Sequence, residues 1–409
     1  MIRKGFNLPY SQIIVLGNGF DLAQHIPSSY RAFFQDRYRE YRDSFKKSIM
    51  PRVTDQVNVE NPCVWDYLFI AWHDTSKKLD YYWKDVESAI KEWVIGKGII
   101  SLNDALDYWS GLSVKSSRPN VVINTYLMIQ KYVNDHSDDI DFSALNSFSD
   151  SSILDDEDAE DPVEILRVKL LDFFAKELHV IEDSFARYLL RVQDNPSYDS
   201  GSRNIYKAMA ETGTDIPLDE QSNVILSFNY TTPLLQEPRE KSIYYHRNVH
   251  GDVDRFSDES AGGYEYHVIF GIDGQAHMDE PGVYQFTKTA RVLKLRRQFL
   301  IGEMAGRSIF DAQNNGSGIA EVKFFGHSLG EADYSYFQSL FDQIDLYGGG
   351  TKLTFFGTAS HPANYDAIIR LMTEYGRTIV PEAHGRNLLH KLLLEDRLKI
   401  ATLDTTIVA

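Results

Sequence analysis

The chain has 409 residues, of which 43% are hydrophobic and 13% aromatic, enough to bury a sizeable core in roughly two or three domain-sized units. Its 59 acidic residues against 42 basic ones give a net charge of -17, which opposes nonspecific binding to nucleic acid or to anionic lipid. A single cysteine, Cys63, excludes disulfides within the chain and zinc sites with several thiolates. No apolar run is long enough to cross a bilayer, and we predict a globular cytoplasmic protein.

A short apolar run, Ile13-Ile14-Val15-Leu16, leads into two glycines, Gly17 and Gly19. The run is too short for anything but a buried strand, and apolar residues at helical spacing continue as far as Phe34. We predict a strand, a tight glycine turn and a helix whose N-terminus favours an anionic or ribose-phosphate ligand. Because the third glycine of the dinucleotide fingerprint is missing, a plain turn without a ligand remains an alternative.

A long section of helical pattern follows this unit. Apolar residues recur at three-to-four spacing and predict helices over residues 65–79, 81–95, 121–133, 162–191 and 204–211. Polar stretches over residues 137–161, which include an acidic run, and over 193–203 predict loops. The tryptophans and tyrosines of this section are expected in its core. We therefore assign residues 41–221 to a helical insertion domain.

Short β-rich runs return after residue 222. Strands are predicted over residues 224–228, 242–245, 267–271, 321–325 and 352–356, with helices over 333–342 and 362–374 between them. Alternating strands and helices favour a largely parallel sheet. The predicted fold class is therefore α/β. Residues 1–40 and 222–409 are expected to form a Rossmann-like nucleotide-binding domain, in which helices flank a largely parallel sheet and the helical insertion follows the first strand and helix.

Polar side chains follow several of these strands. Ligands of a parallel sheet bind beyond the carboxyl ends of its strands, so Asn229 and His250 are candidates for a catalytic couple. An amide offers a donor and an acceptor to ribose hydroxyls or to water, and a histidine can take a proton near neutral pH. Alternatively, Asn229 caps a helix that begins near Thr231, and His250 is a turn residue before Gly251.

Five motifs are spread over nearly the whole chain. They are Gly17-Asn18-Gly19-Phe20-Asp21-Leu22-Ala23, Phe228-Asn229-Tyr230-Thr231, His250-Gly251, Gly271-Ile272-Asp273 and Gly326-His327-Ser328-Leu329-Gly330-Glu331-Ala332-Asp333. In this order they resemble the bacteriophage abortive-infection AbiH family. The resemblance implies a role in bacterial defence against phage, in which an infected cell stops growing or dies in response to a phage-derived trigger.

A second resemblance implies a reaction. The glycine turn followed by His25-Ile26-Pro27, together with Asn229-Tyr230 and His250-Gly251, is similar to sirtuin-type NAD-consuming domains. It implies that NAD or another nucleotide is the substrate and that the bond between nicotinamide and ribose is hydrolysed. In that reaction His250 would be the general base, and Asn229 would orient ribose hydroxyls or the attacking water. The implied nucleotide-binding residues are Gly17, Asn18, Gly19, Phe20, Asp21, Gly326, Ser328 and Asp333.

The chain departs from the sirtuin pattern at Asp21. A carboxylate beside a pyrophosphate needs a compensating cation, for which Lys288 and Arg291 are candidates. The zinc module of deacetylating sirtuins cannot form with one cysteine, so deacetylation and a metal site are not expected. Hydrolysis of NAD or base exchange without a peptide substrate is the expected reaction, and an NAD glycohydrolase is the activity we predict.

Two other classes of function remain open. Gly326-His327-Ser328-Leu329-Gly330 satisfies the pattern of a nucleophile elbow, so Ser328 could serve a serine hydrolase together with Asp345 or Asp366 and with His384 or His390. The third interpretation is a nucleotide sensor that binds without turnover and acts through contacts in a homo-oligomer.

Overall fold

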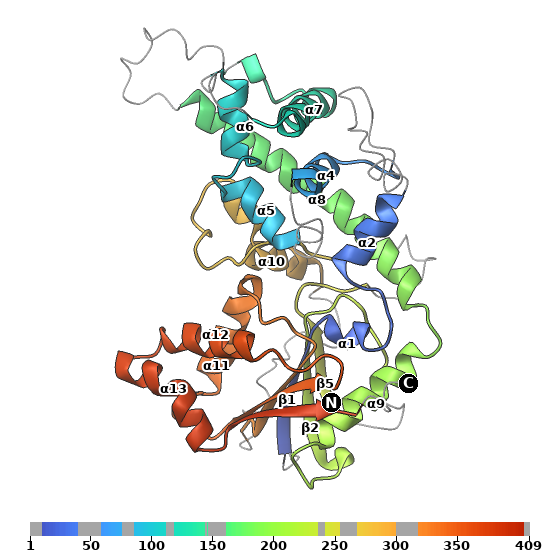
Figure 1. Cartoon of the computed structure of the whole chain (residues 1–409), viewed down its shortest axis with the longest axis vertical. Coiled ribbons are helices and arrows are strands. Elements are labelled where there is room, and N and C mark those ends of the chain that lie inside the picture. Colours follow the sequence, from blue (N-terminus) through green and yellow to red (C-terminus); the bar gives the residue numbers. More distant parts are fainter. Residues whose placement is uncertain are drawn as a thin grey trace. The chain divides into compact units, whose positions relative to one another are not determined.

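A sheet of six parallel strands organises one of the two units of the chain (Figure 1). The computed structural model describes residues 10–39, 59–75, 86–111, 118–143, 145, 161–235, 242–253, 268–299 and 318–404. The strands, in the spatial order β3-β2-β1-β4-β5-β6, are β1 (Tyr10–Leu16), β2 (Gln221–Ser227), β3 (Ile243–Asn248), β4 (Glu321–Phe325), β5 (Lys352–Thr358) and β6 (Leu398–Leu403). This order is that of a Rossmann sheet, which confirms the predicted α/β, Rossmann-like class.

The chain divides into two compact units. The first combines Met1–Ser28, Ala186–Val268 and Lys294–Ala409, and the second combines Ser29–Phe185 and Ile269–Leu293. The division at residues 41–221 that we drew from the sequence stays a prediction. The units seen in the structure assign residues 29–40 and 269–293 to the second unit and residues 186–221 to the first.

The first unit contains helices that connect the strands of the sheet. They are α1 (Gly19–Leu22), α9 (Tyr198–Glu211), α11 (Tyr334–Gln343), α12 (Tyr365–Gly376) and α13 (Glu382–Leu394), with short 3₁₀ helices η3 (Leu218–Glu220) and η7 (Glu331–Asp333). The long helix α8 (Pro162–Gln193) belongs to the second unit as far as Phe185, and α10 (Lys288–Phe299) as far as Leu293.

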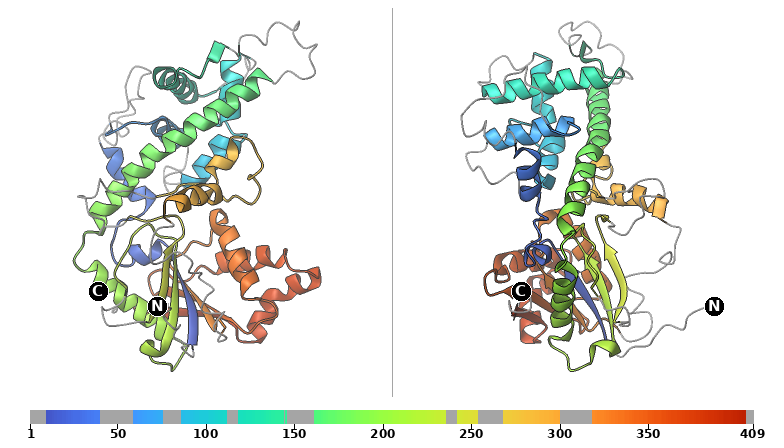
Figure 2. Two further views of the ribbon diagram at one scale, coloured as in Figure 1. Left: turned by 180° about the vertical axis from the view of Figure 1, so that it is seen from behind. Right: turned by 90° about the vertical axis from the view of Figure 1, so that its right-hand side faces the viewer.

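Helices cover both faces of the sheet, which explains the continuous apolar run of its central strand β1. On one face, Ile13 and Val15 share a core with apolar residues of α11, α12 and α13. On the other face, Ile14 and Leu16 share a core with residues of α1 and α9. Figures 1 and 2 show α9 and the group α11 to α13 on opposite sides of the strands. Alternate residues of β1 therefore enter different cores, as the two-residue period of a strand requires.

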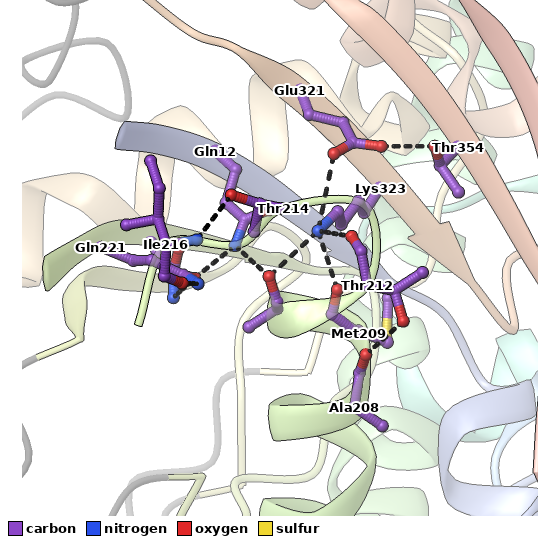
Figure 3. Close-up of polar contacts among 12 residues, drawn as sticks. Gln12, Ala208, Met209, Thr212, Thr214, Ile216, Gln221, Glu321, Lys323 and Thr354 are labelled. Carbon is purple, nitrogen blue, oxygen red and sulfur yellow. Dashed lines mark hydrogen bonds and ion pairs between the residues drawn. The ribbon is translucent and has the colours of Figure 1, made fainter. Parts of the chain in front are cut away.

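A buried lysine ties the sheet to the end of α9 (Figure 3). The ammonium of Lys323 on β4 donates to three backbone carbonyls, those of Met209, Ala210 and Thr212, at 2.8, 3.1 and 2.7 Å. The last carbonyls of a helix have no partner within it, so Lys323 caps the C-terminus of α9. Burial lowers the pKa of Lys323 to about 8, although the Glu321 carboxylate, 3.5 Å away, opposes this effect.

The second unit is helical and has an aromatic core. Its helices are α2 (Tyr30–Arg37), α4 (Val64–Thr75), α5 (Val86–Ile95), α6 (Leu102–Trp109), α7 (Asn120–His136), the first part of α8, the 3₁₀ helix η5 (Val283–Phe286) and the first part of α10. Trp65 packs edge-on against Phe174, and its indole N–H donates to the Phe174 carbonyl at 2.9 Å. Trp65, Trp72 and Trp93 are buried, as expected for core residues, whereas residues 81–83 lie outside the described part of the chain.

Several predicted elements need correction. The helix expected after the glycine turn is broken: α1 ends at Leu22, His25 has a positive φ of 61°, and α2 begins only at Tyr30. The strand predicted over residues 267–271 is wrong for the described residues 268–271, which form none. There the Phe270 N–H donates to the Glu182 carboxylate and not to a backbone carbonyl of a neighbouring strand. The elements β6, α6 and α13 have no counterpart among the predicted ones.

Candidate functional site

The segments that carry the predicted site residues all follow strands at one edge of the sheet. Gly17 follows β1, Asn229 follows β2, His250 follows β3 and Gly326 follows β4. Because the strands are parallel, these segments lie together at the carboxyl edge. A hydrogen bond between Asn229 and Asp21 joins segments that are 208 residues apart in the sequence. The folded chain therefore brings Asn229 to the glycine turn, and it brings His250 to Phe228 and Tyr230, the two neighbours of Asn229 in the sequence.

The two glycine turns flank the point at which the strand order reverses. Strand β1 lies between β2 and β4, and the chain proceeds outward in opposite directions from β1 and from β4. Open parallel sheets of this order bind their ligands in the crevice at this reversal. Gly17 and Gly326, which end β1 and β4, therefore stand where a nucleotide would be sought.

The glycines at this point are required by the approach of two backbones. The Gly17 N–H donates to the Phe325 carbonyl at 3.0 Å, and the Gly19 N–H donates to the Gly326 carbonyl at 2.8 Å. A Cβ on Gly17 would lie 2.4 Å from the His327 Cα, a distance that no side chain could tolerate. We expected a ligand as the close neighbour of this turn, but its close neighbour is the chain's own segment after β4.

The helix that follows the turn is too short to act as an anion-binding N-terminus. Helix α1 has four residues, and its Asn18 N-cap makes no side-chain capping bond. The N–H of Phe20 already donates to the Gly17 carbonyl at 2.8 Å, and that of Gly19 is bonded to Gly326. The expected helix-dipole contribution to anion binding is therefore not supplied by α1.

The Asp21 carboxylate is surrounded by neutral side-chain hydrogen-bond donors. The Tyr198 hydroxyl lies 2.7 Å from its Oδ1, the Thr231 hydroxyl donates to its Oδ2 at 2.8 Å, and the Asn229 amide donates to Oδ1 at 3.3 Å. Asp21 is 1% exposed, and burial raises the pKa of its carboxyl to about 6, an effect limited by the hydrogen bonds from Tyr198, Thr231, Ser28 and Asn229. Asp21 thus joins the glycine turn, the end of β2 and the start of α9.

The two polar side-chain atoms of Asn229 differ in their hydrogen bonds to the described residues. Its Nδ2 donates to Asp21, and its Oδ1 accepts no hydrogen bond from the part of the chain that the structure describes. The residue is 5% exposed, and a buried acceptor left without a donor costs about 1–3 kcal/mol. The interpretation of Asn229 as a helix cap is wrong, since residues 230–235 form no helix. The Asn229 carbonyl oxygen is therefore suited to a ligand that brings a hydroxyl or amide donor.

His250 and His327 lie on the two oxygens of one carboxylate. The His250 Nε2 is 3.1 Å from Asp333 Oδ1, and the His327 Nε2 is 3.3 Å from Asp333 Oδ2. Both imidazole side chains are 4% exposed. The Phe228 ring meets both edge-on, with centroids 5.4 Å from His250 and 4.4 Å from His327. Tyr336 adds a further edge-to-face contact to His250, so the planes of both rings are held by packing.

The other predicted nucleotide-binding residues have different surroundings. The Asn18 side-chain oxygen accepts a hydrogen bond from the Ser28 hydroxyl. Phe20 is fully buried in the core that α1 shares with α9, and its ring lies edge-on to Phe325. Ser328 is exposed and makes no side-chain hydrogen bond to the described residues. Of these three, Ser328 has the surface position that a ligand contact requires.

The geometry does not favour the serine-hydrolase interpretation. A nucleophile elbow strains the backbone of the serine itself, but here the positive φ of 55° belongs to Leu329. The proposed partner His384 stacks on Tyr347, which precedes β5 and so stands at the amino edge of the sheet, opposite to Ser328.

The two candidate cations are compensated within the second unit. The Lys288 ammonium lies 3.5 Å from a Glu87 oxygen, and the Arg291 guanidinium forms a 2.5 Å ion pair with Glu182. Both cations are buried. Asp21 is instead accommodated by the neutral donors of its own unit.

Sequence reasoning missed two members of the site. Tyr198, which contacts the Asp21 carboxylate, falls in the stretch 193–203 that its polar composition assigned to a loop, and α9 in fact begins there. His327 stands inside a motif that drew attention to its serine and glycines. Its Nδ1 accepts the Leu329 N–H at 2.8 Å, a local contact for which no sequence signal exists.

Comparisons with known proteins bear on the family of the chain. Among the described residues no cluster of histidine, cysteine and carboxylate side chains could hold a metal ion, and no described helix is long and apolar enough to cross a membrane. A search of the curated proteins and a search of the solved structures each gave no match. Residues 13–348, most of the chain, match the family model described as Bacteriophage abortive infection AbiH, and the chain therefore belongs to the AbiH family of abortive-infection proteins.

Proposed function

We propose that the cluster of Asn229, His250, His327 and Asp333 at the carboxyl edge of the sheet is a nucleotide-hydrolysing site that cleaves NAD at the bond between nicotinamide and ribose. The observation that carries this proposal is the buried Oδ1 of Asn229, which accepts no hydrogen bond from the described residues. At the same edge of the sheet, His250 Nε2 lies 3.1 Å from a carboxylate oxygen of Asp333. A ribose presents hydroxyl donors to such an oxygen, and a histidine is the usual base for activating water.

The reaction consumes one water per NAD. The bond between the ribose C1′ and the ring nitrogen breaks, and nicotinamide leaves with the bonding electrons, which neutralise its positive ring. The water oxygen forms the new bond to C1′, and His250 takes the proton that water loses and returns it to solvent. The products are nicotinamide, ADP-ribose and one proton, so no further reactant is needed.

The remaining residues have supporting roles in this proposal. Asn229 accepts a hydrogen bond from a ribose hydroxyl, and Ser328 and Gly326 contact the adenosine half. The Asp21 carboxylate is hydrogen-bonded to Tyr198, Thr231 and Asn229. In this proposal it holds the Asn229 amide in place and does not contact the pyrophosphate. This removes the charge repulsion that a carboxylate facing the pyrophosphate would cause.

The proposed reaction gives a physical route to the family's phenotype. Abortive infection stops the growth of an infected cell, and loss of NAD would stop its redox metabolism. The activity would then have to stay low until infection, so we propose that a phage-derived partner activates the enzyme.

The test is nicotinamide release from NAD by the purified full chain, with and without an extract of phage-infected cells. We expect His250→Ala and Asn229→Ala to abolish release, whereas His136→Ala, which alters an exposed histidine at the end of α7, keeps it. Absence of release under both conditions contradicts the proposal. If NAD raises the melting temperature of the protein but no product forms, the protein is a nucleotide sensor and not a hydrolase.

A further inference from the structure

A chain of four groups runs from the backbone after β4 to the proposed base. The Leu329 N–H donates to His327 Nδ1 at 2.8 Å, so that nitrogen carries a lone pair and the His327 proton resides on Nε2. His327 Nε2 faces Asp333 Oδ2 at 3.3 Å, and Asp333 Oδ1 faces His250 Nε2 at 3.1 Å. The first link is a hydrogen bond, whereas the two contacts of Asp333 are charge contacts, and His250 Nε2 does not meet Asp333 Oδ1 in hydrogen-bond geometry. A negative oxygen at 3.1 Å nevertheless repels a lone pair and so favours a proton on His250 Nε2.

We propose that His327 and Asp333 are positioning residues that fix the tautomer and the orientation of His250. The catalytic consequence rests on the proposed function, but the tautomer itself does not. With its proton on Nε2, the nitrogen that lies near the carboxylate, neutral His250 has its lone pair on Nδ1. When the ring takes up a proton, the same carboxylate stabilises the imidazolium. This role differs from the direct nucleotide contact that the sirtuin resemblance implies for Asp333.

The local backbone supports a role for His327 in the Gly-His-Ser-Leu-Gly motif. Leu329 adopts a left-handed φ of 55°, a conformation that a branched residue avoids unless its surroundings impose it, and there its N–H bonds to the His327 ring. Gly326, with a φ of 72°, approaches the backbone of Gly19 so closely that no side chain fits. The motif thus places an imidazole against Asp333, and its serine is not part of the chain of contacts.

Burial makes these contacts effective. The His250 and His327 side chains are each 4% exposed and Asp333 is 14% exposed, so little water competes for the carboxylate. Phe228 touches both imidazoles edge-on and Phe337 lies perpendicular to His327, so neither ring turns without repacking the core. A carboxylate shared by two fixed rings is therefore a rigid support for the base.

The first measurement is independent of activity. Long-range proton–nitrogen NMR on the full chain labelled with ¹⁵N-histidine reports which nitrogen of each ring is protonated. We expect the Nε2–H tautomer for both His250 and His327 in the wild type. In Asp333→Asn the amide can donate to His250, so the His250 tautomer should switch. An unchanged His250 tautomer in Asp333→Asn overturns the inference.

The second measurement separates positioning from binding. We expect Asp333→Asn and His327→Leu to lower kcat for nicotinamide release by about 100-fold or more, the scale of a general base, with KM changed less than about threefold. His327→Gln keeps a side-chain donor for Asp333 and should recover most of kcat, and His136→Gln is the matched control. A change confined to KM, or no recovery in His327→Gln, contradicts the inference. A wild type that releases no nicotinamide rejects the proposed function, and the tautomers then decide the inference alone.

Discussion

Replacing Asp21 by asparagine should change the pH dependence of stability in a direction that the structure fixes. The carboxyl is buried and its pKa is raised from 3.8 to about 6. Between these two values the unfolded chain has lost the proton while the folded chain retains it, so the free energy of unfolding falls as pH rises and levels off above about 6. The difference between a pKa of 3.8 in the unfolded chain and about 6 in the folded chain corresponds to about 3 kcal/mol.

An asparagine at this position has nearly the same shape as the aspartic acid and does not titrate, and the hydroxyls of Tyr198 and Thr231 can reverse to accept from its amide. The stability of Asp21→Asn relative to the wild type should therefore rise by about 3 kcal/mol between about pH 4 and about pH 7. Urea unfolding followed by circular dichroism measures this difference. Asp107→Asn, which removes an exposed carboxylate from α6, sets the baseline for the change in net charge.

The tryptophans provide an internal control for this experiment. All five occur between Ser29 and Phe185, in the second unit, so their fluorescence follows the unfolding of that unit alone. The effect of Asp21→Asn should appear in the dichroism transition of the first unit and leave the fluorescence transition unchanged. A difference that does not vary with pH, or that falls as pH rises, would refute the reasoning.

Three further substitutions test the supports of the site. Lys323→Met leaves the Glu321 carboxylate and the last carbonyls of α9 buried without their cation, so it should lower the free energy of unfolding by about 3–5 kcal/mol. Adding Glu321→Gln should restore part of this loss. Urea unfolding equal to that of the wild type would show that the cap is dispensable. Gly17→Ala drives a Cβ to 2.4 Å from the His327 Cα and should destabilise the first unit by more than about 1–3 kcal/mol, and wild-type urea unfolding would contradict the close approach. Tyr198→Phe removes a hydrogen bond that lowers the pKa of Asp21, so carbon NMR of that carboxyl should show a value above about 6, and a lower value would exclude the contact.

The alternation of strands and helices in the first unit was predictable because its continuous apolar runs indicate buried strands. The runs around Ile13, Val224, Phe324 and Phe355 correspond to β1, β2, β4 and β5, and their parallel arrangement follows from the helices between them. Strand β6 was missed because its residues are partly exposed and lack a continuous apolar run. Local periodicity therefore predicts buried elements better than edge elements.

The composition of the site was harder to predict than its location. Asn229 and His250 could be found because they follow strands, and the carboxyl edge is where parallel sheets bind ligands. The residues that contact them could not be found from the sequence, because the contacts of Asp21 with Tyr198 and of Asp333 with His250 depend on how distant segments pack. The strained Leu329 also leaves no trace in the sequence, since any residue type can be forced into that conformation by its neighbours.

The position of β1 in the sheet has a consequence for synthesis. Tyr10 pairs with Gln221 and Gln12 pairs with Glu321, so both neighbours of this apolar strand emerge from the ribosome long after it does. At roughly 5 to 20 residues per second, the first neighbour arrives roughly 10 to 40 s later. During that interval β1 lacks both of the strands that pair with it in the folded protein. A fragment that terminates before Asp333 lacks the carboxylate that lies between His250 and His327, so these three side chains cannot come together before residue 333 has been synthesised.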